Sequence, residues 1–284
     1  MKTKDLGTTA PNTWCPGCGN FAILNAIKPV LADLDEEGLV AIENVVLVSG
    51  IGCHGKIADY VKANSFYAIH GRTIPVATGI KLANPDLNVI CFAGDGDAYA
   101  EGLDHLIFAA KRNIDITTII HDNRVYGLTT GQYTPTSPSG FLGRSTPAGL
   151  EVPPINPLEI VFASGGSFVA RGYSHGIELL KDIFREAILH RGFSFVDVLQ
   201  VCATFFNLYD YYNERVYTLE EHDPRDRDRA EEKMREWDYN SDGPIPLGIF
   251  YREDASTFGD NFMKYNSKIT DLEGRIRGAL EGFL

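Results

Sequence analysis

The 284-residue sequence predicts an α/β protein with a doubly wound, mostly parallel β-sheet and a C-terminal extension. Apolar segments of strand length alternate with helical segments along most of the chain. Each predicted strand is a nearly continuous apolar run, which is typical of parallel strands covered by helices on both faces. Several of these strands end in glycine turns, and ligands of doubly wound sheets bind beyond the carboxyl ends of the strands.

The first half of the chain opens with a helix and then alternates strands with helices. Apolar residues of the opening helix recur at helical spacing, and Asn20 is its expected N-cap. The predicted elements are helix 20–34, strand 45–53, helix 56–61, strand 66–72, helix 73–83, strand 88–97 and helix 101–113.

The second half continues the alternation after a long loop that is rich in glycine, threonine and proline. Loops of this length inside a compact domain are usually functional or disordered. The predicted elements are strand 115–123, loop 129–155, helix 157–166, strand 168–171, helix 174–190 and strand 193–202.

The segment 210–242 differs from the rest because it is dense in charges of both signs. A solvated surface helix is the expected structure of such a pattern, and a subunit-contact arm is the alternative. A last strand at 244–254 and a C-terminal helix follow. We expect one domain over residues 1–208 and an extension over 209–284 that packs on this domain or on a partner subunit.

Composition excludes several classes of protein. A net charge of −12 argues against nucleic-acid binding, which needs a surface rich in lysine and arginine. No apolar run approaches the roughly 18 residues of a membrane span, and the N-terminus lacks the apolar region of a signal peptide. An odd count of five cysteines does not suggest a secreted disulfide framework, so we expect a cytoplasmic protein.

Polar residues follow two predicted strands at their carboxyl ends. Asp95 lies in the turn Gly-Asp-Gly-Asp after one strand, and Asn123 ends the next strand, 28 residues later. The intervening helix brings the two strands side by side, so a carboxylate, an amide oxygen and a nearby backbone carbonyl face a common point. Hard oxygen donors of this kind suit Mg²⁺, and the glycines allow backbone N–H groups to approach phosphate closely.

Two cysteines, Cys15 and Cys18, form a C-x-x-C motif near the N-terminus. A redox dithiol of thioredoxin type would leave Cys53 and Cys202 unexplained, although both follow predicted strands at the same edge. A Cys₄ zinc site usually consists of two tight pairs, whereas these two cysteines are isolated. An iron–sulfur site is the third interpretation. Cys91 lies inside a strand and is expected to be a small buried hydrophobe.

The segment "GDGDAYAEGLDHLIFAAKRNIDITTIIHDNRVYGLTTGQ" resembles the thiamine diphosphate motif of thiamine enzymes. In detail it resembles the β subunit of the 2-oxoacid:ferredoxin oxidoreductases, the pyruvate/2-oxoglutarate synthase type. The segments "WCPGCGN", "SGIGCHGK" and "HGRTIPVATGIKLANP" are similar to that family in order and spacing. The resemblance covers about residues 12–208 and is weaker in the extension. Asp122-Asn123 stands where the family often has Asn-Asn, and the second position is the implied metal ligand.

The resemblance implies a thiamine diphosphate-binding domain of the PP type with Mg²⁺ and one [4Fe–4S] cluster. The implied Mg²⁺ ligands are Asp95, Asn123 and the backbone carbonyl of Val125. The implied cluster ligands are Cys15, Cys18, Cys53 and Cys202, and helix N-termini beside Cys18 and Cys53 are expected to favour thiolates. The implied cofactor contacts are Ile51, Gly52, Cys53, His54, His70, Gly94, Gly96, Asp97, Gly127 and Leu128, with a structural role for His70 left open.

The family catalyses CoA-dependent oxidative decarboxylation of a 2-oxoacid to acyl-CoA and CO₂, with electrons passing through the cluster to ferredoxin. The reverse reaction is reductive carboxylation. The resemblance implies that an α (or fused α/γ) subunit supplies the catalytic glutamate, as a heterodimer or a dimer of heterodimers. A cluster-free thiamine decarboxylase or synthase subunit and a structural Cys₄ zinc subunit are the alternatives.

Three residues are candidate contacts of the 2-oxoacid. By resemblance, Lys56 and Leu128 lie where the family contacts the oxoacid, and Lys56 is either a carboxylate partner or an exposed helix lysine. Arg144, in the long loop, is a candidate partner for a distal carboxylate. Thr130 stands where some relatives have lysine, which leaves pyruvate and 2-oxoglutarate both open.

Overall fold

A computed structural model describes residues 2–260 and 272–281 of the chain. Its centre is an eight-stranded sheet in which every neighbouring pair is parallel except β10 with β7. This arrangement confirms the predicted doubly wound, mostly parallel sheet. In sheet order the strands are β2 (Asn64–Tyr67), β1 (Val45–Ser49), β3 (Asn88–Gly94), β4 (Ile116–Asp122), β8 (Phe193–Leu199), β7 (Phe168–Tyr173), β10 (Ile245–Arg252) and β9 (Val216–Thr218).

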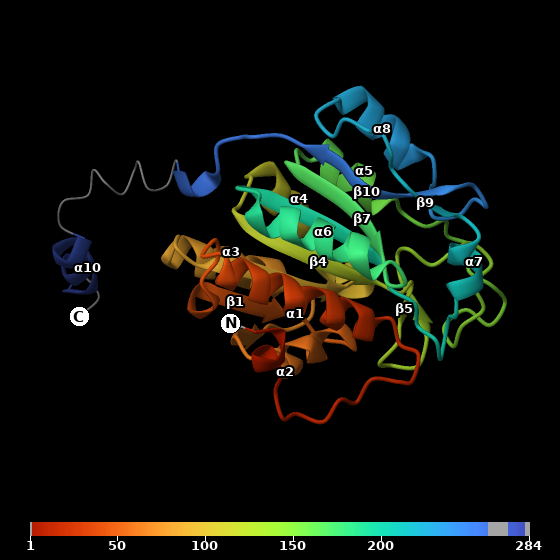
Figure 1. Ribbon diagram of the computed structural model, residues 1–284, viewed down its shortest axis with the longest axis horizontal. Helices are drawn as coiled ribbons and strands as arrows, with labels where there is room; N and C mark the ends of the chain where they lie inside the picture. Colours follow the sequence, from red (N-terminus) through yellow and green to blue (C-terminus); the bar gives the residue numbers. More distant parts are fainter. Residues whose placement is uncertain (1, 261–271, 282–284) are drawn as a thin grey trace.

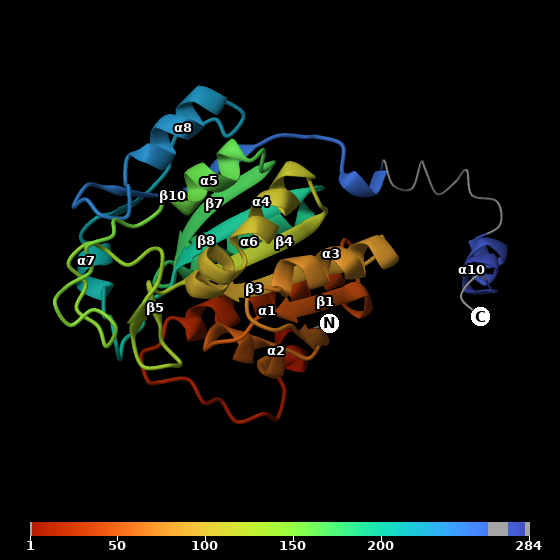
Figure 2. The same cartoon turned by 180° about the vertical axis from the view of Figure 1, so that it is seen from behind.

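Helices cover both faces of the sheet (Figures 1 and 2). One face carries α1 (Asn20–Glu36), α2 (Ile57–Tyr60) and α6 (Ile177–Leu189). The opposite face carries α3 (Thr73–Ala83), α4 (Leu103–Lys111), α5 (Pro157–Ala163) and α8 (Arg227–Arg235). Smaller elements are α7 (Tyr209–Asn213), the hairpin of β5 (Val125–Tyr126) and β6 (Gln132–Tyr133), and α10 (Leu272–Glu281). No helix in the described part of the chain is long and apolar enough to cross a bilayer.

The hydrophobic core is divided by the sheet into two clusters. Successive residues of each central strand point to opposite clusters, so that Cys91 packs with α3 and α4 while Phe92 packs with the cluster of α1 and α6. Cys91 is fully buried, as expected of a small hydrophobe, and burial raises the pKa of its thiol. Side chains buried on both faces explain why the strands are continuous apolar runs.

Several predicted boundaries are corrected at the carboxyl edge of the sheet. Predicted strand 45–53 ends at Ser49, because residues 50–53 form the turn, and predicted strand 193–202 ends at Leu199. Asn20 is not the N-cap of α1; that position is Gly19. The buried Asn20 side chain points to the sheet instead, where its Oδ1 accepts a hydrogen bond from His121 Nδ1 at 2.7 Å.

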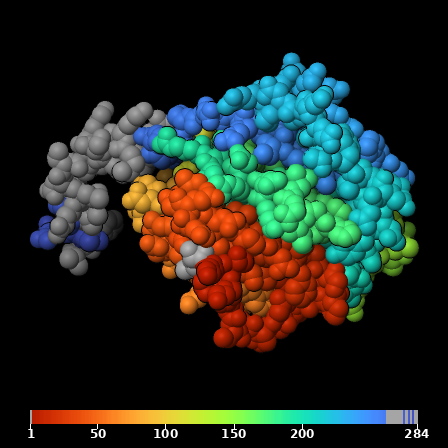
Figure 3. All heavy atoms as spheres, in the orientation of Figure 1, coloured from red at the N-terminus to blue at the C-terminus, as the bar shows by residue number. Residues whose placement is uncertain are grey.

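The charged segment 210–242 contains the predicted helix, α8, but the expectation of a merely solvated helix is wrong. Ala230 and Met234 on α8 are fully buried, and so are Trp237 and Tyr239 beyond it. Strands β9 and β10 extend the central sheet. The chain from α7 to β10 covers one side of the molecule, cyan to blue in Figure 3. The domain boundary between residues 208 and 209 stays a prediction.

The buried face of α8 is testable by paired substitutions in the full chain. Met234→Ala should lower the free energy of unfolding by about 2–5 kcal/mol, because it leaves a cavity in the core. Glu232→Ala, on the exposed face of the same helix, should change it by less than about 0.5 kcal/mol. Urea unfolding followed by circular dichroism measures both, and equal effects would contradict the packing of α8.

Candidate cofactor and metal sites

Two adjoining pockets lie at the carboxyl edge of the sheet. The cofactor pocket is formed by the turns after β1, β3 and β4, and the cysteine pocket, of about 270 Å³, lies beside it. All ten predicted cofactor contacts and the three predicted Mg²⁺ ligands line the cofactor pocket. All four predicted cluster cysteines line the cysteine pocket. The residues that line both pockets are Cys53, Asn123, Gly127 and Leu128.

The buried His54 ring lines the cofactor pocket. It lies against the last residue of β3, where a Cβ at Gly94 would come within 2.7 Å of its Nδ1, so only glycine fits there. Its Nε2 lies 3.4 Å from Oδ2 of Asp97. The other Asp97 oxygen, Oδ1, accepts a 2.6 Å hydrogen bond from the backbone N–H of Gly71. Asp97 therefore ties the turns after β1, β2 and β3 together.

His70 lies at the mouth of this pocket with half of its side chain exposed. Its Nδ1 is 3.7 Å from Asp97 Oδ1. His70, Asp97 and Glu101 bring their potential ligand atoms within 4.8 Å of one another. A half-exposed ring beside a buried carboxylate is available to a ligand in the pocket.

The predicted Mg²⁺ ligands Asp95 and Asn123 are held by their neighbours. Asp95 is buried, and its Oδ2 accepts a 3.0 Å hydrogen bond from the hydroxyl of Thr136. Burial raises the pKa of Asp95 to about 6. Asn123 Oδ1 accepts from the N–H of Val125 at 3.0 Å, and Asn123 Nδ2 donates to Gln200 Oε1 at 3.1 Å. Carboxylate, amide and carbonyl oxygens make a donor set that fits Mg²⁺.

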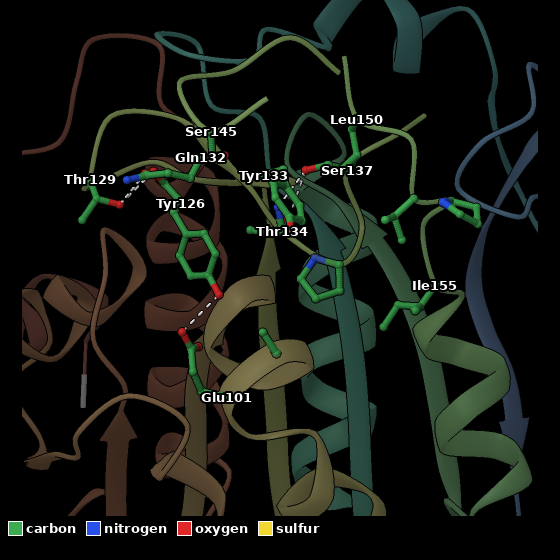
Figure 4. A pocket seen from close by; sticks show the side chains of 14 residues that line it. Glu101, Tyr126, Thr129, Gln132, Tyr133, Thr134, Ser137, Ser145, Leu150 and Ile155 are labelled. Atoms are coloured by element: carbon green, nitrogen blue, oxygen red, sulfur yellow. Dashed lines mark hydrogen bonds between the residues drawn. The ribbon is translucent and has the colours of Figure 1, made fainter. Parts of the chain in front are cut away.

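Tyr126 lines both the cofactor pocket and a third cavity of about 650 Å³, which the long loop also lines and which Figure 4 shows. Its hydroxyl is 3.1 Å from Glu101 Oε1, at the end of a one-turn π-helix, Asp97–Glu101. Such π-turns often occur at functional sites, and nothing in the helical sequence pattern predicts this one. Thr136, Gln200 and Tyr126 were not among the predicted site residues.

The loop of residues 15–19, here called the cysteine loop, is held in place by three hydrogen bonds. The N–H of Cys18 donates to the carbonyl of Cys15 at 3.1 Å, and that of Gly19 donates to the carbonyl of Val201 at 3.0 Å. The hydroxyl of Tyr209 donates to the carbonyl of Gly17 at 3.0 Å. These bonds bring the loop beside the strand end that carries Cys202.

Cys53 and Cys202 approach each other from the ends of β1 and β8. A Cβ built on Gly127 would lie 3.7 Å from the Sγ atom of each, so both sulfurs lie close to the same point. The indole N–H of Trp14 donates to the carbonyl of Cys53 at 2.7 Å, and Gln200 Nε2 donates to Cys18 Sγ at 3.7 Å. Segments far apart in sequence therefore supply one thiol site.

Burial is the largest influence on the pKa of the Cys18 and Cys53 thiols. It raises the pKa of Cys18 to about 12 and also raises that of Cys53, and neighbouring cysteines add to both shifts. The backbone N–H of Asn20, at the start of α1, lowers the pKa of Cys18, as expected of a helix N-terminus, but desolvation outweighs this effect. A cationic centre is the group that stabilises several thiolates in such surroundings.

The three candidate substrate contacts lie in different surroundings. Lys56 lines the cysteine pocket, and half-exposed Leu128 lines both pockets. Arg144 is exposed and lines neither, but its Nη1 donates a 2.6 Å hydrogen bond to Thr130 Oγ1. Thr130 lines the cysteine pocket, so Arg144 is one residue removed from it.

Comparison with known proteins agrees with a thiamine-binding site. Residues 50–198 match the family model of the C-terminal TPP-binding domain of thiamine pyrophosphate enzymes. Residues 202–267 match the model of the C-terminal part of the pyruvate ferredoxin oxidoreductase β subunit. The fold and these matches define a thiamine pyrophosphate-binding subunit of the oxidoreductase class.

Individual relatives narrow this class. The chain is 42% identical to a 2-oxoacid:ferredoxin oxidoreductase subunit beta from Sulfolobus, over 90% of this chain and 87% of the relative. It is 44% identical to a 2-oxoglutarate synthase subunit KorB from Methanothermobacter marburgensis, over 69% of this chain and 67% of the relative. A solved 2-oxoglutarate:ferredoxin oxidoreductase from Magnetococcus marinus, with 2-oxoglutarate, coenzyme A and succinyl-CoA bound, superposes with a TM-score of 0.90. Its sequence is 33% identical, and the match covers 99% of this chain and 96% of that one. The chain belongs to the β subunits of the 2-oxoacid:ferredoxin oxidoreductases.

The close approach at Gly96 can be tested without any cofactor. A Cβ at Gly96 would lie 2.3 Å from the Tyr126 ring, so Gly96→Ala should lower the unfolding free energy by about 1–3 kcal/mol through overpacking. In a Tyr126→Ala background the same change should cost much less, which a double-mutant cycle measures. Gly79→Ala, in a helix with open space around it, should instead stabilise by about 0.5–1 kcal/mol. Equal costs of Gly96→Ala in both backgrounds would contradict the contact.

Proposed function

We propose that this chain carries the thiamine diphosphate and one [4Fe–4S] cluster of a 2-oxoacid:ferredoxin oxidoreductase. The enzyme would convert a 2-oxoacid, with CoA, reversibly to an acyl-CoA and CO₂ and would pass the electrons to ferredoxin. One observation carries the proposal: the cofactor pocket and the four-cysteine pocket share a wall that includes Cys53. An electron acceptor in the second pocket would adjoin a cofactor in the first.

The oxygen-rich edge of the cofactor pocket supports Mg²⁺ and a diphosphate there. Asp95, Asn123 and the carbonyl of Val125 would hold the metal, and the glycine turns leave room for phosphate beside backbone N–H groups. When bound, thiamine diphosphate supplies an electron sink for the loss of CO₂ from a 2-oxoacid. In this chain, His54 and Asp97 would keep the turns around it in register, and Leu128 would cover its exposed side.

The spacing of the thiols favours a cluster over a single zinc ion. Four thiolates around Zn²⁺ lie about 3.8 Å from one another, as bonds of about 2.3 Å in a tetrahedron require. In the described part of the chain, three or more ligand atoms lie within 4.8 Å of one another at His70, Asp97 and Glu101, and not at the cysteines. A larger centre with four thiolate ligands, Cys15, Cys18, Cys53 and Cys202, fits a [4Fe–4S] cluster.

The enzyme would be active only with a partner α (or fused α/γ) subunit. The described residues form one central sheet, and the cofactor pocket lies at its carboxyl edge. They include no second sheet of comparable size that could bind the aminopyrimidine ring. The partner would supply that second domain and the catalytic glutamate. Residues 1–208 would be the cofactor domain, and 209–284 would be the extension.

We propose 2-oxoglutarate as the substrate. Pyruvate is the alternative, because residues 202–267 match a model named for pyruvate ferredoxin oxidoreductase. Among the relatives are 2-oxoglutarate synthase subunits, and the superposed enzyme was solved with 2-oxoglutarate and succinyl-CoA. Lys56, which lines the cysteine pocket, is the proposed partner of a substrate carboxylate, and Arg144 is the proposed partner of the distal one.

Cysteine substitutions in the anaerobically purified heteromer test the cluster. The wild type should contain about four iron and four sulfide per β chain and bleach with dithionite. Cys18→Ser should lose the iron, the colour and ferredoxin reduction but retain thiamine diphosphate. Cys91→Ser, in the core and away from both pockets, should keep all of them.

The same measurements separate the alternatives. Zinc in place of iron would support the structural zinc site, and colourless protein with bound thiamine diphosphate would support a cluster-free decarboxylase. Oxidation of a 2-oxoacid by the purified chain alone would contradict its dependence on a partner.

The role of Arg144 is testable through substrate preference. If the wild-type heteromer prefers 2-oxoglutarate to pyruvate, Arg144→Ala should reduce the ratio of their kcat/KM values by about tenfold or more. A hydrogen bond to a charged group contributes about 1.5–3 kcal/mol, which supports this magnitude. Arg112→Ala, an exposed arginine on the α4 side, is the control and should leave the ratio unchanged. An unchanged ratio in Arg144→Ala would exclude the proposed contact.

A further inference from the structure

Arg124 stands between two of the proposed Mg²⁺ ligands, Asn123 and Val125, and its side chain is directed into the protein interior. The residue is 2% exposed, and its backbone is left-handed, with φ of +62°. Its N–H donates to Asp122 Oδ1 at 3.1 Å, and its carbonyl accepts from Ser137 Oγ at 2.5 Å. The guanidinium lies over the ring of Trp237 with 5.5 Å to the centroid.

The guanidinium joins two segments that are far apart in sequence. Its Nε donates to the carbonyl of Thr136 at 2.6 Å, and its Nη2 donates to the carbonyl of Tyr239. Thr136 is the residue whose hydroxyl contacts Asp95. Arg124 is thus connected to one proposed ligand through Thr136 and to two others through its own backbone.

Tyr239 is itself held in place by a buried network. It has a left-handed backbone, with φ of +64°, and is fully buried. Its ring stacks on Trp237 at 4.3 Å, and its hydroxyl donates to Asp197 Oδ2 on β8 at 2.6 Å. The carboxylate of Asp238 accepts from the N–H groups of Asn240 and Ser241 at 2.9 and 2.7 Å, which closes the turn around Tyr239.

We infer that Trp237 and Tyr239, from the charged segment 210–242, form a brace. This brace positions residues 123–125, the metal loop, through the side chain of Arg124. Two left-handed, non-glycine residues joined by one hydrogen bond are a costly arrangement, which the surrounding structure must maintain. Outer-shell partners of this kind orient metal ligands, and their loss typically weakens metal affinity about 10–100-fold. Arg124 and Tyr239 are positioning residues here, since neither is a proposed ligand. The inference rests on the proposed Mg²⁺–thiamine diphosphate site.

The test measures thiamine diphosphate binding to the heteromer by calorimetry as Mg²⁺ is varied. Arg124→Met should raise the half-saturating Mg²⁺ concentration about 10–100-fold, with cofactor binding restored at high Mg²⁺. Arg124→Lys keeps the charge and one donor and should give a smaller increase. Iron content and melting temperature, which a general loss of folding would change, should stay near wild type in Arg124→Lys.

A matched control comes from the same extension. The Arg227 guanidinium lies 4.2 Å from the centroid of the Phe162 ring and donates to the Tyr251 hydroxyl at 3.4 Å, both away from residues 123–125, so Arg227→Met should leave the Mg²⁺ dependence unchanged. An unchanged half-saturating Mg²⁺ concentration in Arg124→Met would overturn the brace. An equal increase of this concentration in Arg227→Met would also overturn it. If the heteromer with Arg124→Met does not assemble, the half-saturating Mg²⁺ concentration of Arg124→Lys tests the brace instead, and an unchanged value would overturn it. If the wild type binds thiamine diphosphate equally well with and without Mg²⁺, that result would instead contradict the proposed function.

Discussion

Parallel pairing of β1, β3, β4 and β8 is the constraint on which the rest of the site depends. Because these strands run in the same direction, the turns that follow them meet at one edge of the sheet, and both pockets consist largely of those turns. Asp95, Asn123, Cys53 and Cys202 each follow a different strand of this set. One pairing pattern therefore brings oxygen donors and thiols into adjoining positions.

Burial of carboxylates at this edge has an electrostatic consequence. Asp95 and Asp122 both contact the Thr136 hydroxyl, and burial raises the pKa of each, with the neighbouring Asp197 adding to the shift of Asp122. A hydroxyl donates a single proton, so it cannot satisfy two ionised carboxylates at once. A cation beside Asp95 would relieve that conflict, as a metal centre would for the buried thiols of the neighbouring pocket.

The parts of the site that follow strand ends could be predicted from the sequence, because strand length and glycine turns determine which edge they reach. Asp95, Asn123, Cys53 and Cys202 are of this kind. Thr136 could not be predicted to contact Asp95, since it comes from a long loop without periodicity. The buried face of α8 was hidden for another reason: Met234 is an isolated apolar residue among charges, and only its tertiary contacts distinguish this segment from a solvated helix.

Residues after 208 contact loops beside both pockets, although none of the described residues after 208 lines either pocket. Tyr209, at its start, donates to the carbonyl of Gly17 in the cysteine loop, and Tyr239 accepts from Arg124 in the metal loop. In sequence β9 lies between these two tyrosines and β10 follows the second, and both strands lie at the far edge of the central sheet. Residues 209–252 therefore belong to the architecture of the site, even though they supply none of its proposed ligands. A segment whose composition indicates a surface helix thus makes tertiary contacts with loops that follow other strands.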